Sequence, residues 1–189
     1  PQASDISSEA AVVMENSTNT ILYSKNADEV LFPGSTVKIM TCLLALENTQ
    51  LTDQVTMTAT GVSGVTDGGA SISSQVDEVF TVEQCLYAIM VASANDIALQ
   101  IAEHVGGSVD GFVQQMNARA QELGCTNTVF TNPTGLPDDN QHTTAHDMAL
   151  IMQAAIQNES FRTIAAATSY TIPATNMAAA RNLTSKFTM

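Results

Sequence analysis

A nearly continuous apolar stretch after Pro33 and Gly34 constrains the fold of this chain more than any other feature. Residues 35–47 read STVKIMTCLLALE, and they are apolar almost all the way round a helix. A helix without a polar face lies inside a core rather than on a surface. The sequence therefore predicts a buried central helix, with Lys38 inside its apolar run.

Segments on both sides of this helix predict an α+β fold. Residues 10–15 and 20–24 are short apolar stretches, and the Asn-Ser-Thr-Asn between them is typical of a hairpin turn. A two-stranded hairpin is marginal by itself, so it needs more strands beside it. Apolar residues at helical spacing predict helices before and after a break at 92–95, and further helices at 109–123 and about 145–157.

Composition limits the class of protein. The chain has 189 residues, which suits one domain with a sizeable core. Its net charge of -13 gives a surface that repels phosphate, so we expect no nucleic-acid partner. No apolar run reaches the roughly 18 residues that a membrane span needs. Cys42, Cys85 and Cys125 lie in or beside apolar patterns without CxxC spacing, so buried free thiols are predicted.

Two histidines at a spacing of four suggest a metal site, which the sequence does not otherwise support. We expect Thr144 to cap a helix, so that His142 precedes this helix and His146 lies inside it. The two rings then do not share a helical face. The glutamate of an H-E-x-x-H pattern is also absent, because Thr143 takes its place. We therefore expect no metal and no cofactor.

Ser35 and Lys38 are the first candidates for chemistry. They are three residues apart at the predicted start of the central helix, so their side chains share one face. Free backbone N–H groups and the helix dipole favour a developing negative charge at Ser35. Burial lowers the pKa of Lys38, and a neutral amine beside a hydroxyl is a general base beside a nucleophile. A chance S-x-x-K with a capping serine is the alternative, but it does not explain a lysine in an apolar run.

The break between the two middle helices holds the second set of candidates. The Ser93 hydroxyl can relay a proton, and the Asn95 amide can hold a substrate carbonyl. The same residue types are common in simple turns. Asp96, which follows them, is expected to be a helix cap rather than an acid catalyst.

Four segments in the same order resemble the penicillin-recognising serine enzymes. Residues 35–38 and 93–95 resemble their SxxK and SxN motifs. The flanking residues narrow the resemblance to the low-molecular-mass D-Ala-D-Ala carboxypeptidases, and it extends from about Ser8 to Arg181. The matching segments are PGSTVKIMT at 33–41, SANDIA at 93–98, FTNPTGL at 130–136 and HTTAHDMA at 142–149.

This resemblance implies a transpeptidase-like fold, with a helical subdomain packed on an antiparallel sheet. It implies removal of the terminal D-Ala from peptidoglycan stem peptides, outside the cytoplasm in a bacterial cell envelope. Ser35 is then the acylated nucleophile and Lys38 its base. Ser93 relays the proton to the leaving D-Ala, and Asn95 positions the substrate amide. Penicillins and other β-lactams acylate Ser35 as substrate mimics.

The sequence departs from the family in one respect. The third family motif, Lys-Thr-Gly or a variant, has no match between Tyr170 and Met189, and Thr184-Ser185-Lys186 has the wrong order. The later sheet strands of the family are also not found. We therefore expect residues 1–189 to be a single, C-terminally incomplete catalytic domain with little or no activity alone. An unpaired hairpin edge would favour self-association.

Two other functions stay open at this point. A serine β-lactamase shares SxxK but needs a further group to activate the deacylating water, for which Glu122, Asp138 and Asp139 are available. The lifetime of a penicillin adduct separates the two, since it is long for a carboxypeptidase and short for a lactamase. A non-catalytic helical binding module would tolerate the loss of both Ser35 and Lys38.

Overall fold

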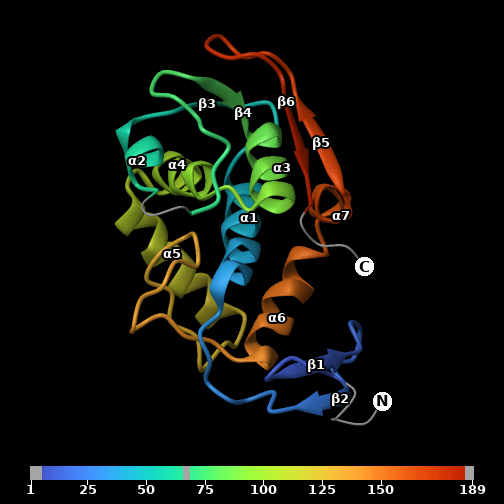
Figure 1. The fold of residues 1–189 in the computed structure, drawn as a ribbon. Coiled ribbons are helices and arrows are strands. Elements are labelled where there is room, and N and C mark those ends of the chain that lie inside the picture. The colour runs from blue at the N-terminus through green and yellow to red at the C-terminus, as the bar shows by residue number, and fades with distance from the viewer. Residues whose placement is uncertain (1–5, 66–68, 186–189) are drawn as a thin grey trace.

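The computed structural model describes residues 6–65 and 69–185, and a long helix lies at its centre (Figure 1). This helix, α1, spans Val37–Asn48 and follows a short 3-10 turn, η2, at Gly34–Thr36. Every residue from Val37 to Ala45 except Ile39 is buried. The prediction of a buried central helix is therefore confirmed.

The helices predicted after α1 are also present. The break predicted at 92–95 lies between α3 and α4, and the last predicted helix ends two residues earlier than expected. Thr144 caps that helix as predicted, because its hydroxyl accepts a hydrogen bond from the Asp147 amide at 3.0 Å. The short helices α2 and α7 were not predicted. The helices are α2 (Ala59–Ser63), α3 (Val82–Ala92), α4 (Asn95–Gly106), α5 (Val109–Glu122), α6 (Ala145–Ala155) and α7 (Glu159–Ala165).

The strands of the described residues form three separate antiparallel pairs, so the α+β class is confirmed. The predicted N-terminal hairpin is the first pair. Within the described residues, these pairs do not join into one sheet of the kind that the resemblance implies. β1 contacts α6, whereas β5 and β6 contact α3 (Figure 1). The pairs are β1 (Ala11–Met14) with β2 (Ile21–Lys25), β3 (Gln54–Thr56) with β4 (Val79–Thr81), and β5 (Ser169–Ile172) with β6 (Arg181–Thr184).

One hydrophobic core joins the helices. α1 contacts α3, α4 and α6, and its apolar side chains merge with theirs into one cluster. The N-terminus of α3 is fixed by a capping box, in which Thr81 and Gln84 bond each other's backbone N–H groups. This capping box sets where α3 begins, and the helix then ends next to Ser93.

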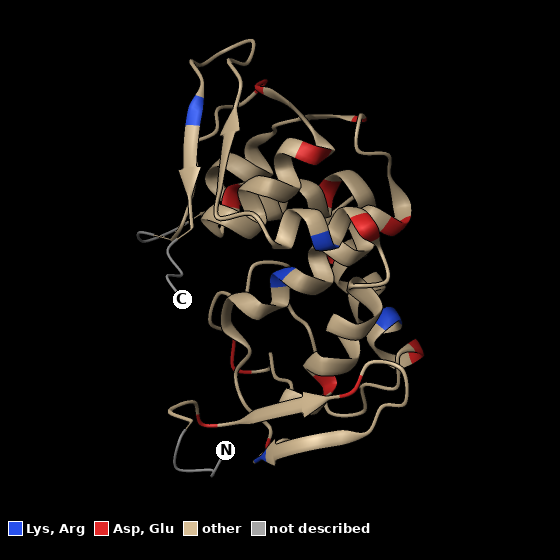
Figure 2. Ribbon diagram, turned by 90° about the vertical axis from the view of Figure 1, so that its right-hand side faces the viewer, with Lys and Arg blue, Asp and Glu red and all other residues tan. Residues whose placement is uncertain are grey.

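Acidic residues outnumber basic ones in this chain, by 19 to 6. Figure 2 shows acidic residues spread over several helices and loops, while the few Lys and Arg residues lie apart from one another. The described residues therefore present no basic patch for a phosphate backbone. In the same part of the chain, no helix is both long and apolar enough to cross a membrane.

Candidate active site

Ser35 lies on the 3-10 turn that leads into α1, and its residue is exposed. Gly34 before it has a φ of +56°, a backbone conformation that glycine adopts without strain. Gly135 packs so closely here that a Cβ on it would lie 1.9 Å from the Gly34 carbonyl oxygen. The two glycines thus allow a distant loop to touch the turn that carries the serine.

Lys38 lies one helical turn after Ser35 and is buried, with 3% of its surface exposed. Its Nζ donates to Ser35 Oγ at 3.4 Å and to the Thr134 carbonyl oxygen at 2.5 Å. Among the described residues, no carboxylate forms an ion pair with it. Desolvation by burial lowers the pKa of Lys38 from 10.5 to about 8, and the negative charge of a Cys42 thiolate would act in the opposite direction. The site therefore holds an amine that can lose its proton near neutral pH.

The loop at 132–135 positions Lys38 from the other side. Thr41 Oγ1 donates to the Pro133 carbonyl oxygen at 2.8 Å, one turn after the Lys38 contact. Asn132 stabilises the loop, because its Oδ1 accepts from the amides of Thr134 and Gly135. Residues 130–136 contributed to the family resemblance, yet no role for the Thr134 carbonyl was predicted. A backbone carbonyl has no side-chain signature, so the sequence had no signal for this contact.

Ser93 joins the site from the end of α3. Its Oγ donates to Ser35 Oγ at 3.3 Å. Ser93 has a φ of +57° and a ψ of 33°, a left-handed conformation that ends α3 and lets the chain turn at once into α4. The structure therefore brings three predicted residues, Ser35, Lys38 and Ser93, into one hydrogen-bonded group.

Asn95, the fourth predicted residue, opens α4 and is buried, with 5% of its surface exposed. Its Oδ1 atom is buried and has no hydrogen-bond partner among the described residues. A buried polar atom without a partner is uncommon, and at a candidate site it marks a place for a donor from a ligand. No contact joins Asn95 directly to Ser35 or Lys38.

A pocket of about 320 Å³ opens beside the serine. Its polar part includes Ser35, Lys38 and Ser93, and its apolar part includes Ile89 and Met90 of α3. A larger apolar groove of about 650 Å³ begins nearby, between β1, the segment at 31–36 and α6. The smaller pocket is the one that holds the candidate chemistry.

The prediction that Asp96 caps a helix is wrong. The N-cap of α4 is Ala94, which has no side-chain capping bond, and Asp96 is the second residue of the helix. The Asp96 carboxylate turns instead to Ser71 and Ser74, whose hydroxyls donate to it at 2.8 and 2.7 Å. These partners lie more than twenty residues earlier in the chain, so no local pattern predicts them.

The cysteine prediction is confirmed, because Cys42, Cys85 and Cys125 are all buried and free. Burial raises the pKa of all three thiols, to about 12 for Cys42 and Cys125. Such thiols are inert as nucleophiles.

The two histidines make separate contacts. His146 Nδ1 lies 3.1 Å from Asp28 Oδ1, and His142 Nδ1 lies 3.0 Å from the Asn140 carbonyl oxygen. In residues 6–65 and 69–185, no group of three or more His, Cys, Asp or Glu side chains has the arrangement of a metal site.

With this geometry in view, comparison with known proteins places the chain in a family. Residues 1–187 match the S11 peptidase family, described as D-alanyl-D-alanine carboxypeptidase. The chain is 38% identical over 166 residues to the D-alanyl-D-alanine carboxypeptidase DacF of Bacillus subtilis, covering 84% of this chain and 42% of that protein. It is 33% identical over 166 residues to the D-alanyl-D-alanine carboxypeptidase DacC of Escherichia coli, covering 83% of this chain and 41% of that protein.

Solved structures agree with the sequence comparison. A variant of the Streptomyces K15 DD-transpeptidase superposes with a TM-score of 0.89 at 30% identity, over 98% of this chain and 75% of that chain. Penicillin binding protein 5 from Haemophilus influenzae superposes with a TM-score of 0.85 at 29% identity, over 97% of this chain and 53% of that chain. The chain belongs to the D-alanyl-D-alanine carboxypeptidase family. It spans about 40% of the length of the curated relatives that it matches first.

Proposed function

We propose that this chain carries the acylation site of a serine D-Ala-D-Ala carboxypeptidase. The substrate is a peptidoglycan stem peptide that ends in D-Ala-D-Ala, and β-lactams are its mimics. The observation that carries the proposal is that Ser35 Oγ lies within reach of both Lys38 Nζ and Ser93 Oγ, while Lys38 is buried without a carboxylate. Family membership supports the substrate class.

In the acylation step, Ser35 Oγ attacks the carbonyl carbon of the penultimate D-Ala as Lys38 Nζ accepts its proton. The backbone N–H of Ser35 donates one hydrogen bond to the oxyanion that forms. Ser93 passes its hydroxyl proton to the nitrogen of the terminal D-Ala, which leaves as the C–N bond breaks, and Ser93 takes up in exchange the proton that Lys38 accepted. Asn95 holds the amide of the substrate in line. Water then hydrolyses the acyl-serine and releases the shortened peptide.

A β-lactamase needs an acidic group beside the acyl-serine, and the candidates for it make other contacts. Glu122 bonds Arg119 on the same helix at 3.0 Å, and Asp138 accepts from the Asn140 amide in an exposed loop. Asp139 is exposed in the same loop. Among the described residues, none of the three makes a hydrogen bond or ion pair with Ser35, which favours a long-lived penicillin adduct.

The test is intact-mass spectrometry after incubation with benzylpenicillin, on the protein as its cell produces it and on this 189-residue chain. We expect a penicilloyl adduct on the former that is stable for longer than the assay and absent in Ser35→Ala. Ser7→Ala, which changes an exposed serine, is the matched control. A folded protein that gains no adduct would overturn the proposal, and an adduct lost within seconds would favour the lactamase.

The short chain alone is expected to stay unlabelled or to label slowly. The family resemblance assigns the cation that binds the substrate carboxylate to the Lys-Thr-Gly motif, and this motif is not found in residues 1–189.

We also propose that the chain acts in the bacterial envelope and that the chain alone self-associates through β1 and β2, which expose Val13, Ile21 and Leu22. Size-exclusion chromatography that showed a compact monomer at high concentration would contradict self-association.

A further inference from the structure

The segment at 70–74 binds the start of α4, directly beside Asn95. Asp96 is 1% exposed, and one of its carboxylate oxygens, Oδ2, accepts three hydrogen bonds. The donors are Ser71 Oγ at 2.8 Å, Ser74 Oγ at 2.7 Å and the Ser74 amide at 3.2 Å. The Ile72 amide lies 3.4 Å from the other oxygen. A carboxylate with this many donors is held in one orientation.

The same segment also binds the backbone of Asn95. The Asn95 amide donates to the Ala70 carbonyl oxygen at 2.7 Å. Since Ala94 makes no side-chain cap, this carbonyl satisfies an amide that would otherwise be free at the helix start. Asn95 is therefore bound through its own backbone and through its neighbour Asp96 to a single short segment.

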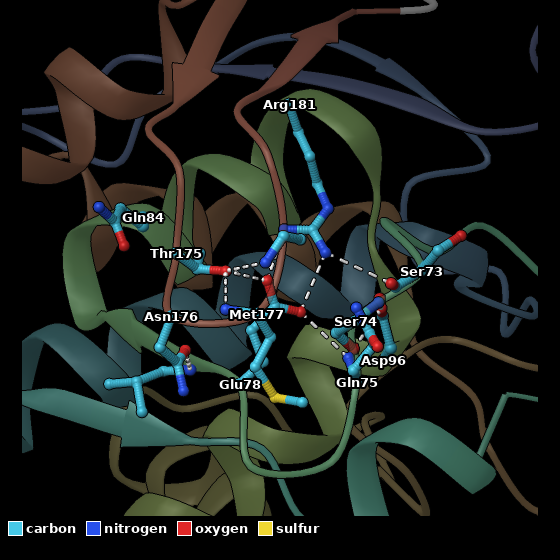
Figure 3. A network of polar contacts seen from close by, with 12 residues as sticks. Ser73, Ser74, Gln75, Glu78, Gln84, Asp96, Thr175, Asn176, Met177 and Arg181 are labelled. Atoms are coloured by element: carbon cyan, nitrogen blue, oxygen red, sulfur yellow. Dashed lines mark hydrogen bonds and ion pairs between the residues drawn. The ribbon is translucent and has the colours of Figure 1, made fainter.

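The loop that follows this segment, at residues 75–78, is anchored by an ion pair on the buried Glu78 carboxylate, which also accepts from the Gln75 amide at 3.1 Å. Arg181 of β6 donates to both carboxylate oxygens of Glu78, at 2.7 and 2.9 Å, and the Glu78 side chain is fully buried. Figure 3 shows Arg181 reaching from the C-terminal hairpin to Glu78, with Ser74 and Asp96 alongside, and Arg181 Nη2 also donates to the Ser73 carbonyl oxygen at 3.4 Å. The segment is thus joined to α4 through Asp96 and Asn95, and to β6 through Arg181 and the loop at 75–78.

We infer that Asp96 is a positioning residue for Asn95, acting through Ser71 and Ser74. This inference rests on the proposed function, in which Asn95 holds the substrate amide. Asp96 itself faces the 70–74 segment rather than the pocket beside Ser35, so it does not touch the substrate. Its carboxylate holds the segment whose Ala70 carbonyl fixes the Asn95 backbone, and this sets where the Asn95 side chain lies.

The competing explanation is that Asp96 only stabilises α4 through the helix dipole. Asp110 provides the matched control, since it is the second residue of α5 and exposed. Asp96→Asn and Asp110→Asn remove the same charge from the same helical position. Only at Asp96 does the change also remove an acceptor that binds another segment, because an amide nitrogen cannot accept the hydrogen bonds that Ser71, Ile72 and Ser74 donate to the carboxylate.

The first experiment is a double-mutant cycle on the rate of Ser35 acylation by benzylpenicillin, in the protein as its cell produces it. Asp96→Asn is expected to slow acylation about tenfold, the equivalent of about 1.4 kcal/mol. In an Asn95→Ala background the same change is expected to slow it less than about twofold, because the positioned side chain is already gone. Asp110→Asn should leave the rate unchanged. Equal slowing by Asp96→Asn in both backgrounds, or no slowing in either, would overturn the inference.

The second experiment is amide hydrogen exchange, which does not depend on activity. Asp96→Asn is expected to speed exchange at Ile72, Ser74 and Asn95 while the amides in the middle of α4 stay protected. Loss of protection at Ile72 and Ser74 with Asn95 unchanged would overturn the inference. If wild-type protein were not acylated, the proposed function would fail, while exchange at Asn95 would still decide whether Asp96 positions it. Should Asp96→Asn not fold, Ser74→Ala replaces it in both experiments.

Discussion

Two cationic side chains, one buried and one half-buried, lie in different parts of this molecule and behave in opposite ways. Lys38 in α1 meets a hydroxyl and a carbonyl oxygen, whereas Arg181 in β6 meets the carboxylate of Glu78. Burial without a counter-charge lowers the pKa of Lys38 to about 8. Burial alone would raise the pKa of Glu78, but hydrogen bonds from Arg181 and Thr175 hold it below its ordinary value of 4.5. The first environment supports the proposed role of Lys38 as a base, and the second makes a fixed structural link.

The reactive amine and the structural ion pair also lie in different parts of the chain. The Lys38 environment is built from a helix turn and one loop, so it lies next to the reacting serine. The Glu78 environment joins β6 to the loop that follows the 70–74 segment, and this segment binds the Asn95 backbone. Both halves of the site therefore rely on contacts of high sequence separation, but only one of them carries a group that titrates near neutral pH.

The largest expected effect comes from removing the titrating amine. Lys38→Arg keeps a cation but not a base, because the guanidinium stays protonated at every accessible pH. We expect the acylation rate of Ser35 to fall by about 10²–10⁴-fold, the usual contribution of a general base. Intact-mass kinetics with benzylpenicillin measure it, and Lys25→Arg, which changes a lysine outside the pocket, is the control. Acylation at the wild-type rate would remove Lys38 from the chemistry.

The next effect tests the paired cation. Arg181→Met leaves the buried Glu78 carboxylate without its counter-charge, so the free energy of unfolding should fall by about 3–5 kcal/mol. Equilibrium urea unfolding measures the change. The double variant Glu78→Leu with Arg181→Met should recover part of the loss, because no charge is then left unpaired. A single variant as stable as wild type would show that the pair is not the anchor proposed above.

The same pair predicts a dependence on pH with a defined sign. The folded pKa of Glu78 is lowered, so the unfolded chain binds the proton more readily in acid. The ionised Glu78 carboxylate therefore stabilises the folded state above pH 4.5, and this stabilisation is lost as the pH falls below 4.5. The difference in unfolding free energy between wild type and the double variant should therefore shrink as pH falls below 4.5. A difference that stayed constant to pH 3 would contradict the assignment.

A smaller effect tests how α1 is held against the loop at 132–135. Thr41→Val keeps the shape of the side chain but removes the hydroxyl that donates to the Pro133 carbonyl. Leaving that buried acceptor without a donor should cost about 1–3 kcal/mol of stability. Acylation should slow only a few-fold, since Lys38 keeps its own bond to the loop. Thr163→Val on α7, whose hydroxyl bonds its own helix on the surface, is the control, and urea unfolding compares the two.

The sequence was most informative where the relevant contacts are local. The Ser35–Lys38 pair is one helical turn apart, and an apolar run already indicates that Lys38 is buried. The break beside Ser93 and Asn95 follows from apolar residues at helical spacing on each side of it. These elements could therefore be predicted without knowledge of which segments meet in space.

The remaining features depend on contacts between distant segments. Glu78 and Arg181 lie 103 residues apart, and Asp96 bonds residues that the sequence shows only as an irregular Ser-rich stretch. The same reason explains why Asp96 was interpreted as a cap, since its residue type and place fit a local role. The helix α7 was missed because seven residues are too few for a helical period to stand out.

The most direct test of this account is the pH dependence of Ser35 acylation by benzylpenicillin, measured by intact mass in the protein as its cell produces it. Lys38 is the base only in its neutral form, so the acylation rate should rise about tenfold per pH unit below its pKa and level off above about 8. The plateau should be missing in Lys38→Arg. A wild-type rate that does not change between pH 6 and 9 would contradict the account, as would the same profile in both proteins.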